Sequence, residues 1–264
     1  MEFHAPRTLQ DALRIRSQDA AARPLAGGTD LMVMLNGGHG RRPGALLDLG
    51  RVDELRGWHR DGDELVLGAA LTYTEAQVGE LATALPALAA ASRSVGSPQI
   101  RNRGTLGGNL ATASPAGDSL PPLLVEGARI ELASVRGTRT LPLAEFLVGP
   151  KRSALQPDEL VTGVRLRPSG AAQTFMKIGP RNAMVISVCS LALSADRERG
   201  ELRAAFGSAG PVAGLVVAPL DEADTFAERV VAAASPIDDL RGTAAYRRHA
   251  LGVLTRRALG RCLV

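Results

Sequence analysis

The chain has 264 residues, of which 45% are hydrophobic, and a formal net charge of +4. This length is enough to bury a large core in one domain or in two to three smaller ones. An aromatic content of 3% and dispersed arginines argue against nucleic-acid binding, which uses basic grooves and stacked aromatic rings.

The same composition argues against a metal protein and against a membrane protein. Two cysteines are too few for an iron–sulfur cluster, and four scattered histidines do not form a zinc-site pattern. No apolar run approaches the length of a membrane span, and the first residues lack the pattern of a signal peptide. We therefore expect a folded protein of the cytoplasm.

The first 57 residues predict a small βαβ-like unit. Thr8 and Asp11 form a capping pattern at the start of an amphipathic helix expected over residues 8–17. Thr29 is expected to cap a second helix, which follows a glycine turn. The expected strands cover residues 24–26 and 45–49.

Short strands and helices alternate from residue 58 to about residue 168. Residues 61–63, Asp-Gly-Asp, predict a hairpin turn before a strand over 64–68. Thr72 and Glu75 form a second capping pattern. The other expected elements are helices over 75–81, 86–95 and 120–126, strands over 129–133 and 138–141, and a strand that ends at Leu166.

A linker is expected at residues 168–170, Pro-Ser-Gly, and the composition changes after it. The predicted strand over 185–193 has small or apolar residues on both faces, which is typical of a buried strand. The other elements expected here are strands over 174–178 and 202–206 and helices over 222–234 and 243–262.

Two glycine-rich loops are the segments of this sequence whose residues suggest ligand binding. The first reads LAGGTDL, residues 25–31, and the second lies within residues 97–122, which include RGTLGGN. Glycines let the main chain approach a ligand, and successive N–H groups in turns form anion-binding concavities. The pair indicates a pyrophosphate held from both sides, although Gly27 and Gly28 could instead form only a tight turn. Neither loop has the GxGxxG fingerprint of a Rossmann unit.

Three motifs, AGGTDL, IRNRGTLGGNLATASPAGD and FMKIGPRNAMVISV, occur in the order and spacing of a known family. Over residues 3–259 the chain resembles the FAD-binding medium subunit of the xanthine dehydrogenase and carbon monoxide dehydrogenase family. The resemblance implies an α+β fold, with a two-subdomain FAD-binding domain of the PCMH/VAO type and a small C-terminal sheet-plus-helices domain like that of CO dehydrogenase flavoproteins. The implied boundaries are 1–168 for the FAD-binding domain, with subdomains of about 1–57 and 58–168, and 169–264 for the C-terminal domain.

The resemblance also implies which residues hold FAD. The first loop would wrap the pyrophosphate, and the second would complete the phosphate and ribityl contacts, with Asp118 accepting a hydrogen bond from a hydroxyl. Leu160 or Val161 matches an apolar residue packed on the flavin rings, and Lys177 matches a basic residue near the pyrimidine edge, where a cation stabilises the reduced flavin. The implied cofactor-binding residues are Leu25, Ala26, Gly27, Gly28, Thr29, Asp30, Leu31, Thr105, Gly107, Gly108, Asn109, Ser114, Asp118, Leu160, Val161 and Lys177.

The residue types alone leave other roles open for three of these positions. Leu160 could simply pack in the core, Lys177 could end a strand in solvent, and Asp118 could cap a helix that begins at Ser119. Since neither glycine loop contains a His or Cys, FAD is expected to be bound noncovalently.

The chain has no residues for a molybdenum pocket or a cluster, so the resemblance implies an electron-transfer subunit. It would accept electrons from the iron–sulfur clusters of a small subunit, which receives them from a large molybdenum-cofactor subunit, and pass them to NAD, a quinone or oxygen. The segment RNAMVIS resembles family members that act on purines or other N-heterocycles. Two alternatives stay open: a stand-alone FAD-dependent oxidoreductase on the same fold, and a non-catalytic binding or assembly protein.

Overall fold

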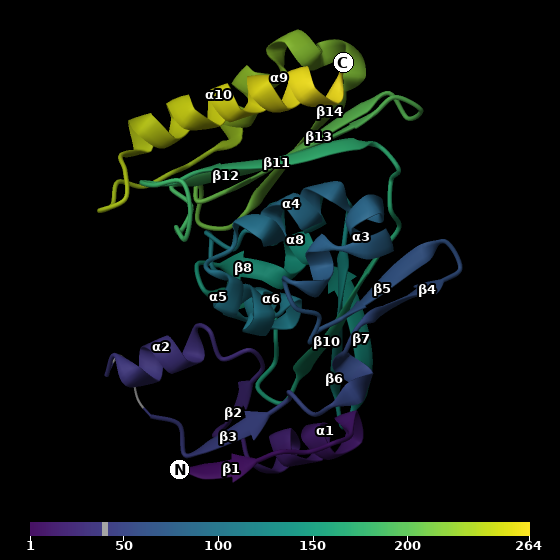
Figure 1. The fold of residues 1–264 in the computed structure, drawn as a ribbon, viewed down its shortest axis with the longest axis vertical. Helices are drawn as coiled ribbons and strands as arrows, with labels where there is room; N and C mark the ends of the chain where they lie inside the picture. Colours follow the sequence, from purple (N-terminus) through teal and green to yellow (C-terminus); the bar gives the residue numbers. More distant parts are fainter. Residues whose placement is uncertain (39–41) are drawn as a thin grey trace.

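Three larger sheets follow one another along the chain in the computed structural model, which describes residues 1–38 and 42–264 (Figure 1). The first sheet is parallel and has the order β1-β3-β2. Helix α1 packs beside β3, and α2 connects β2 to β3, so the predicted βαβ unit is present. These elements are β1 (Glu2–His4), α1 (Leu9–Gln18), β2 (Ala22–Leu25), α2 (Leu31–Asn36) and β3 (Ala45–Asp48).

The two helix caps predicted in this unit have different outcomes. The Thr8 side chain accepts a hydrogen bond from the Asp11 N–H at 3.1 Å, which confirms the cap of α1. Thr29 does not cap α2, and that prediction was wrong. The backbone of Asp30 is already helical and occupies the N-cap position, while its side chain lies 3.4 Å from the Thr112 hydroxyl instead of bonding a helix N–H.

The second sheet is antiparallel and has the order β4-β5-β10-β6-β7. The predicted hairpin turn joins β4 to β5, with Gly62 at φ +62°. The helix expected over 75–81 is instead a 3₁₀ turn followed by α3, because Gly79 at φ +64° interrupts the helical backbone. The strands are β4 (Trp58–Asp61), β5 (Glu64–Gly68), β6 (Arg129–Ser134), β7 (Gly137–Pro142) and β10 (Leu160–Leu166).

Short helices and a small two-stranded sheet accompany this second sheet (Figure 1). The helices are η1 (Asp53–Leu55), η2 (Glu75–Gln77), α3 (Gly79–Ala84), α4 (Pro86–Ser94), α5 (Pro98–Arg103), α6 (Leu106–Thr112), α7 (Leu120–Val125) and α8 (Leu143–Phe146), and the small sheet is β8 (Leu147–Gly149) with β9 (Arg152–Ser153).

The third sheet is antiparallel, with its four strands in sequence order. Helices α9 and α10 cover one face, while α4 and α7 of the preceding unit pack on the sheet from the other side (Figure 1). All residues of β12 are buried, which confirms the predicted buried strand, although it begins at Cys189 rather than at Val185. The elements are β11 (Ala172–Ile178), β12 (Cys189–Asp196), β13 (Glu201–Gly207), β14 (Gly214–Pro219), η3 (Leu220–Glu222), α9 (Ala223–Ala233) and α10 (Ala244–Cys262).

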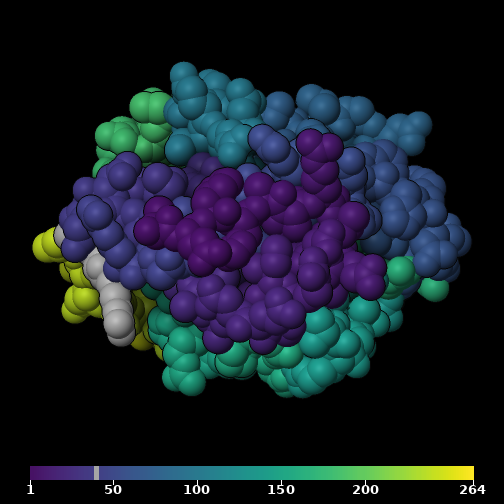
Figure 2. Space-filling model, turned by 90° about the horizontal axis from the view of Figure 1, so that it is seen from below, coloured from purple at the N-terminus to yellow at the C-terminus, as the bar shows by residue number. Residues whose placement is uncertain are grey.

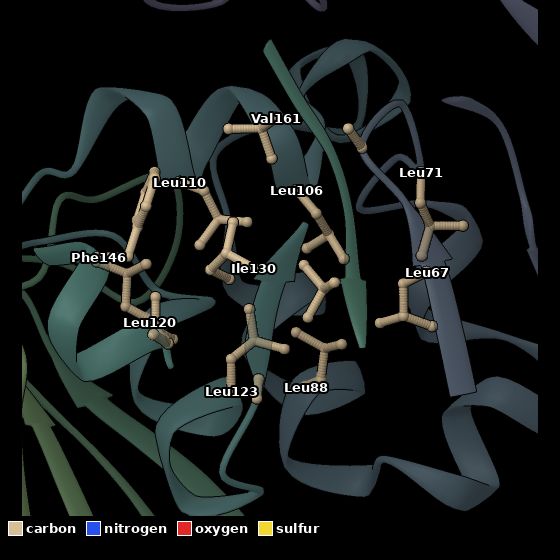
Figure 3. Close-up of a cluster of buried hydrophobic side chains, with 14 of the residues drawn as sticks. Leu67, Leu71, Leu88, Leu106, Leu110, Leu120, Leu123, Ile130, Phe146 and Val161 are labelled. Carbon is tan, nitrogen blue, oxygen red and sulfur yellow. The ribbon is translucent and has the colours of Figure 1, made fainter. Parts of the chain in front are cut away.

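Two hydrophobic cores hold the molecule together. The larger core runs through the first two sheets and surrounds α6, where Leu106 and Leu110 face Ile130 of β6 (Figure 3). The smaller core lies between the third sheet and helices α9 and α10. The division into 1–57, 58–168 and 169–264 remains a prediction, with which the order of the sheets agrees.

The N-terminal sheet and its helices form one end of the molecule, and seen from below they cover the middle of that face (Figure 2). Within residues 1–38 and 42–264, none of the helices has the length and hydropathy that crossing a membrane requires.

We predict that Leu110→Ala lowers the free energy of unfolding by about 2–5 kcal/mol, because Leu110 is fully buried and its truncation leaves a cavity beside α6. Urea denaturation of the purified protein measures the change. Val148→Ala, at a side chain 52% exposed, is the control and should change stability by less than about 0.5 kcal/mol. Equal effects of the two substitutions would contradict the described core.

Candidate functional site

The two glycine loops touch each other through their backbones. A Cβ atom on Gly27 would lie 2.5 Å from the Arg103 carbonyl carbon and closer still to its oxygen, so no other residue fits there without movement. The Thr112 hydroxyl lies 3.4 Å from an Asp30 carboxylate oxygen and forms a second link. The first loop is thus seated on the end of α5 and beside α6, although about 80 residues separate them in sequence.

The N–H groups of the first loop are the strongest candidate for a ligand-binding feature in the described residues. None of the N–H groups from residue 26 to residue 31 donates a hydrogen bond to any atom of residues 1–38 and 42–264. Gly28, at φ +76°, turns the chain within this run. Successive free N–H groups in a turn attract anions, so this loop has the chemistry of a phosphate-binding site.

The helix after this loop is apolar but lacks buried residues. Met32 is 41% exposed and Val33 is 69% exposed in α2, whose sequence reads LMVMLN. The loop and helix together therefore present free donors next to uncovered apolar surface.

The second glycine loop differs, because the N–H groups of Leu106, Gly107 and Gly108 already have partners inside the protein. Leu106 donates to the Leu71 carbonyl at 3.0 Å, and Gly107 donates to the Ala69 carbonyl at 2.8 Å. The Gly108 N–H donates to the side chain of Thr105, which caps α6, at 3.1 Å. The phosphate contacts predicted for Gly107 and Gly108 therefore gain no support from their N–H groups and remain a prediction.

Gly107 has a structural reason to be glycine. A Cβ atom there would lie 2.7 Å from the Cβ of Ala69, so the missing side chain lets α6 pack closely on the segment after β5. Other predicted residues lie near the same helix: the Asn109 side chain accepts a hydrogen bond from the Ser119 hydroxyl at 2.6 Å, and half-buried Ser114 bonds the Ala116 N–H at 3.3 Å.

Asp118 and Lys177 form a buried ion pair between the second and third sheets. The Lys177 Nζ donates to Asp118 Oδ2 at 2.6 Å and to the Ser94 carbonyl at 2.8 Å. The other Asp118 oxygen accepts from the Ser187 hydroxyl at 2.5 Å. Burial raises the pKa of Asp118 from its ordinary value, and the ammonium group of Lys177 opposes this rise.

This pair decides between the roles that the sequence left open. The Lys177 side chain is 9% exposed, so it does not end a strand in solvent. Asp118 does not cap α7, because Ser119 occupies the N-cap position without a side-chain cap bond. In the segment before β12, the Val185 carbonyl accepts from Lys177 and the Ser187 hydroxyl donates to Asp118. Because this segment bonds the ion pair instead of the neighbouring strand, β12 begins later than predicted.

A pocket of about 620 Å³ opens next to Lys177, between α4, α5 and the segment that follows β11. Its charged lining residues are Arg93, Arg101, Lys177 and Arg181. Leu160 and Val161 lie elsewhere, 2% and 6% exposed, and Val161 points into the larger core (Figure 3). Core packing is thus the role that the structure gives them, and their contact with a flavin stays a prediction.

Sequence reasoning missed Tyr73, Ser119 and Ser187. The Tyr73 ring packs where Gly104 lacks a side chain, 2.9 Å from the position of an added Cβ, and the Tyr73 N–H donates to the Gly104 carbonyl at 3.1 Å. Burial raises the pKa of the Tyr73 hydroxyl, which therefore stays protonated. A possible signal was its place inside the Thr72 and Glu75 capping pattern, since a tyrosine is rare in this chain.

No group of three or more His, Cys, Asp or Glu side chains within residues 1–38 and 42–264 is arranged to hold a metal ion. The candidate site has four parts: the first loop with its unbonded N–H groups, the apolar helix α2, the polar residues around α6, and the buried ion pair of Asp118 and Lys177.

We predict that Lys177→Met lowers the free energy of unfolding by about 3–5 kcal/mol, because it leaves the Asp118 carboxylate buried without its cation. Loss of the ammonium group removes the influence that lowers the pKa of Asp118, so the folded state of the variant holds its proton above the ordinary pKa of 3.8. The unfolded state releases that proton first, so the variant should lose stability as pH rises above about 4, more steeply than the wild type.

Urea denaturation between pH 4 and pH 8 measures this difference. The double variant Asp118→Asn with Lys177→Met removes both charges and should recover part of the loss. A single variant with the stability and pH dependence of the wild type would contradict the buried pair.

Comparison with known proteins agrees with this geometry. The family model described as the FAD binding domain in molybdopterin dehydrogenase matches residues 1–168. The xanthine dehydrogenase FAD-binding subunit of Escherichia coli O157:H7 is 31% identical over 97% of this chain and 94% of its own length. The nicotine 6-hydroxylase medium subunit of Paenarthrobacter nicotinovorans is 32% identical over 98% and 96%.

A solved structure extends the agreement to the whole chain. A chain of the reconstituted CO dehydrogenase from Oligotropha carboxidovorans superposes with a TM-score of 0.92 at 26% identity, covering 99% of this chain and 97% of that one. The expected fold, including the C-terminal sheet-plus-helices unit, is thereby confirmed. With a family model that matches well over half of its length, this chain belongs to the FAD-binding domains of molybdopterin dehydrogenases.

Proposed function

We propose that this chain is the FAD-binding electron-transfer subunit of a molybdenum-containing hydroxylase or dehydrogenase, with FAD held noncovalently. The observation that carries the proposal is the run of N–H groups at residues 26–31 without acceptors in the described ranges. A pyrophosphate supplies the negative oxygens that such a run binds. The dinucleotide would lie along the contact between the first loop and α6.

Each part of the site has a role in this proposal. The main chain of residues 26–31 holds the pyrophosphate, with Leu25 at the end of β2 leading into it. Thr105, Asn109 and Ser114 lie beside the bound molecule around α6. Exposed apolar residues of α2 exclude water from its other side. FAD, when bound, supplies the ability to accept and release electrons one or two at a time.

The Lys177 and Asp118 pair is proposed to lie near the pyrimidine edge of the flavin. Since Asp118 lies 2.6 Å from the ammonium group, the pair presents little net charge to the cofactor. The three N–H groups of Lys177 already bond Asp118, Ser94 and Val185, so Lys177 would act on the cofactor only through the weak field of this pair. Its effect on the flavin potential should be smaller than that of an unpaired lysine.

The partners in this proposal are an iron–sulfur small subunit and a large subunit with the molybdenum cofactor. Support comes from the relatives, which are named as medium or FAD-binding subunits of larger enzymes. Two are named for xanthine and nicotine, so an N-heterocyclic substrate for the whole complex, acting in the cytoplasm, is part of the proposal. NAD, a quinone and oxygen all remain as acceptors to test.

We predict that Gly27→Ala weakens FAD binding at least about tenfold, because the added methyl group pushes the first loop away from the Arg103 carbonyl. Fluorescence titration of the cofactor-free protein with FAD measures the affinity. Gly44→Ala is the matched control, since its added Cβ would meet no atom of residues 1–38 and 42–264 closer than Ala21 at 3.8 Å. This variant should bind FAD as the wild type does.

Tight FAD binding by both variants would show that the contact between the loops does not build the site. A wild-type protein that takes up no FAD would overturn the proposed function itself. Turnover of an N-heterocycle by the isolated chain would instead favour the stand-alone oxidoreductase.

A further inference from the structure

Arg247 is the buried arginine of helix α10, with 3% of its surface exposed. Its Nη1 atom donates to two carbonyl groups, that of Val188 at 2.9 Å and that of Ser208 at 2.6 Å. Its Nη2 atom donates to the Asp239 carboxylate at 2.6 Å. A guanidinium group has donors and no acceptor, so the direction of each of these bonds is fixed.

The two carbonyl groups belong to segments that reach across to the FAD-binding unit. Ser187, which directly precedes the first carbonyl group, is fully buried and donates from its hydroxyl to Asp118 Oδ1 at 2.5 Å. Ser208 supplies the second carbonyl group, and its N–H donates to the Pro115 carbonyl at 2.7 Å. Residues 115–118 are therefore bonded at both ends by segments that one arginine nitrogen joins.

The backbone around Ser208 is built for this close approach. Ser208 has φ +57°, a conformation that residues other than glycine rarely adopt and that persists only where the surroundings hold it. The bond from Arg247 to its carbonyl and the bond from its N–H to Pro115 both hold it. A Cβ atom on the preceding Gly207 would lie 3.2 Å from the Pro115 carbonyl oxygen, so a side chain there would crowd the contact.

We propose that Arg247 is a positioning residue for the FAD site. By fixing the segments of Ser187 and Ser208, it sets the place of Asp118 and of the residues before it, and it acts through these segments without touching the cofactor. This inference rests on the proposed function, because Ser114 and Asp118 belong to the proposed FAD site.

The test is a double-mutant cycle with Arg247→Met, Ser187→Ala and the variant with both changes. FAD affinity is titrated at a temperature at which urea denaturation shows each cofactor-free protein to be folded. Arg247→Met should weaken FAD binding about three- to tenfold, because residues 115–118 lose part of their support. In the Ser187→Ala background, where one of the two links is already cut, the loss should be at least about threefold smaller.

A purely structural role for Arg247 gives a different result. Removing a buried cation that pairs with Asp239 lowers the free energy of unfolding in either case. If Arg247 only stabilised the fold, the folded variant would bind FAD with the affinity of the wild type. The affinity of the folded protein therefore separates the two roles.

Two further variants complete the design. Arg247→Lys keeps a cation beside Asp239 but donates from one nitrogen where the guanidinium group uses several, so it should weaken FAD binding at least about twofold. It takes the place of Arg247→Met in the cycle if the latter does not fold. Arg256→Met is the matched control on the same helix, since the Arg256 side chain is 62% exposed, and FAD affinity should not change.

Wild-type FAD affinity in the folded Arg247 variant, or an equal loss in both backgrounds, would overturn this proposal. Both outcomes require that the wild type binds FAD. They are thus distinct from a failure of the proposed function, in which the wild type itself takes up none.

Discussion

The site depends on the close contact between the backbone of Gly27 and the carbonyl group of Arg103. This contact brings a loop of the first sheet against the helices of the second, and it is possible only because residue 27 has no side chain. Within residues 1–38 and 42–264 the N–H groups of this loop have no acceptor, whereas in a sheet or a helix they would be satisfied. Unsatisfied N–H groups are costly unless water or a ligand bonds them, so the same geometry that joins the two units leaves donors suited to an anion.

Glycine in the two loops therefore serves two different purposes. In the first loop it permits a close approach at Gly27 and, at Gly28, a positive φ that turns the chain. In the second loop Gly107 permits α6 to pack on Ala69, and its N–H already donates a hydrogen bond to the Ala69 carbonyl. A glycine-rich sequence is thus evidence for close packing as much as for a bound phosphate.

This distinction marks what the sequence could and could not predict. Local patterns determined most elements, because the cap at Thr8, the turn at Gly62 and the buried strand β12 depend on neighbouring residues. The motifs of the family indicated the two glycine loops as the FAD site, and this assignment stays a prediction. Thr29 and the start of β12 were predicted wrongly, since both depend on partners distant in sequence: Thr112 bonds Asp30, and Asp118 bonds Ser187. Ser119 was missed for the same reason, because its hydrogen bond to Asn109 exists only in the folded chain.

Amide hydrogen exchange of the cofactor-free protein, before and after addition of FAD, tests the central claim most directly. The account predicts that exchange slows most at residues 26–31, where the N–H groups gain an acceptor, and changes little at Leu106, Gly107 and Gly108, whose N–H groups are bonded already. Protection confined to residues 106–108, with residues 26–31 unchanged, would contradict it and move the pyrophosphate to the second loop.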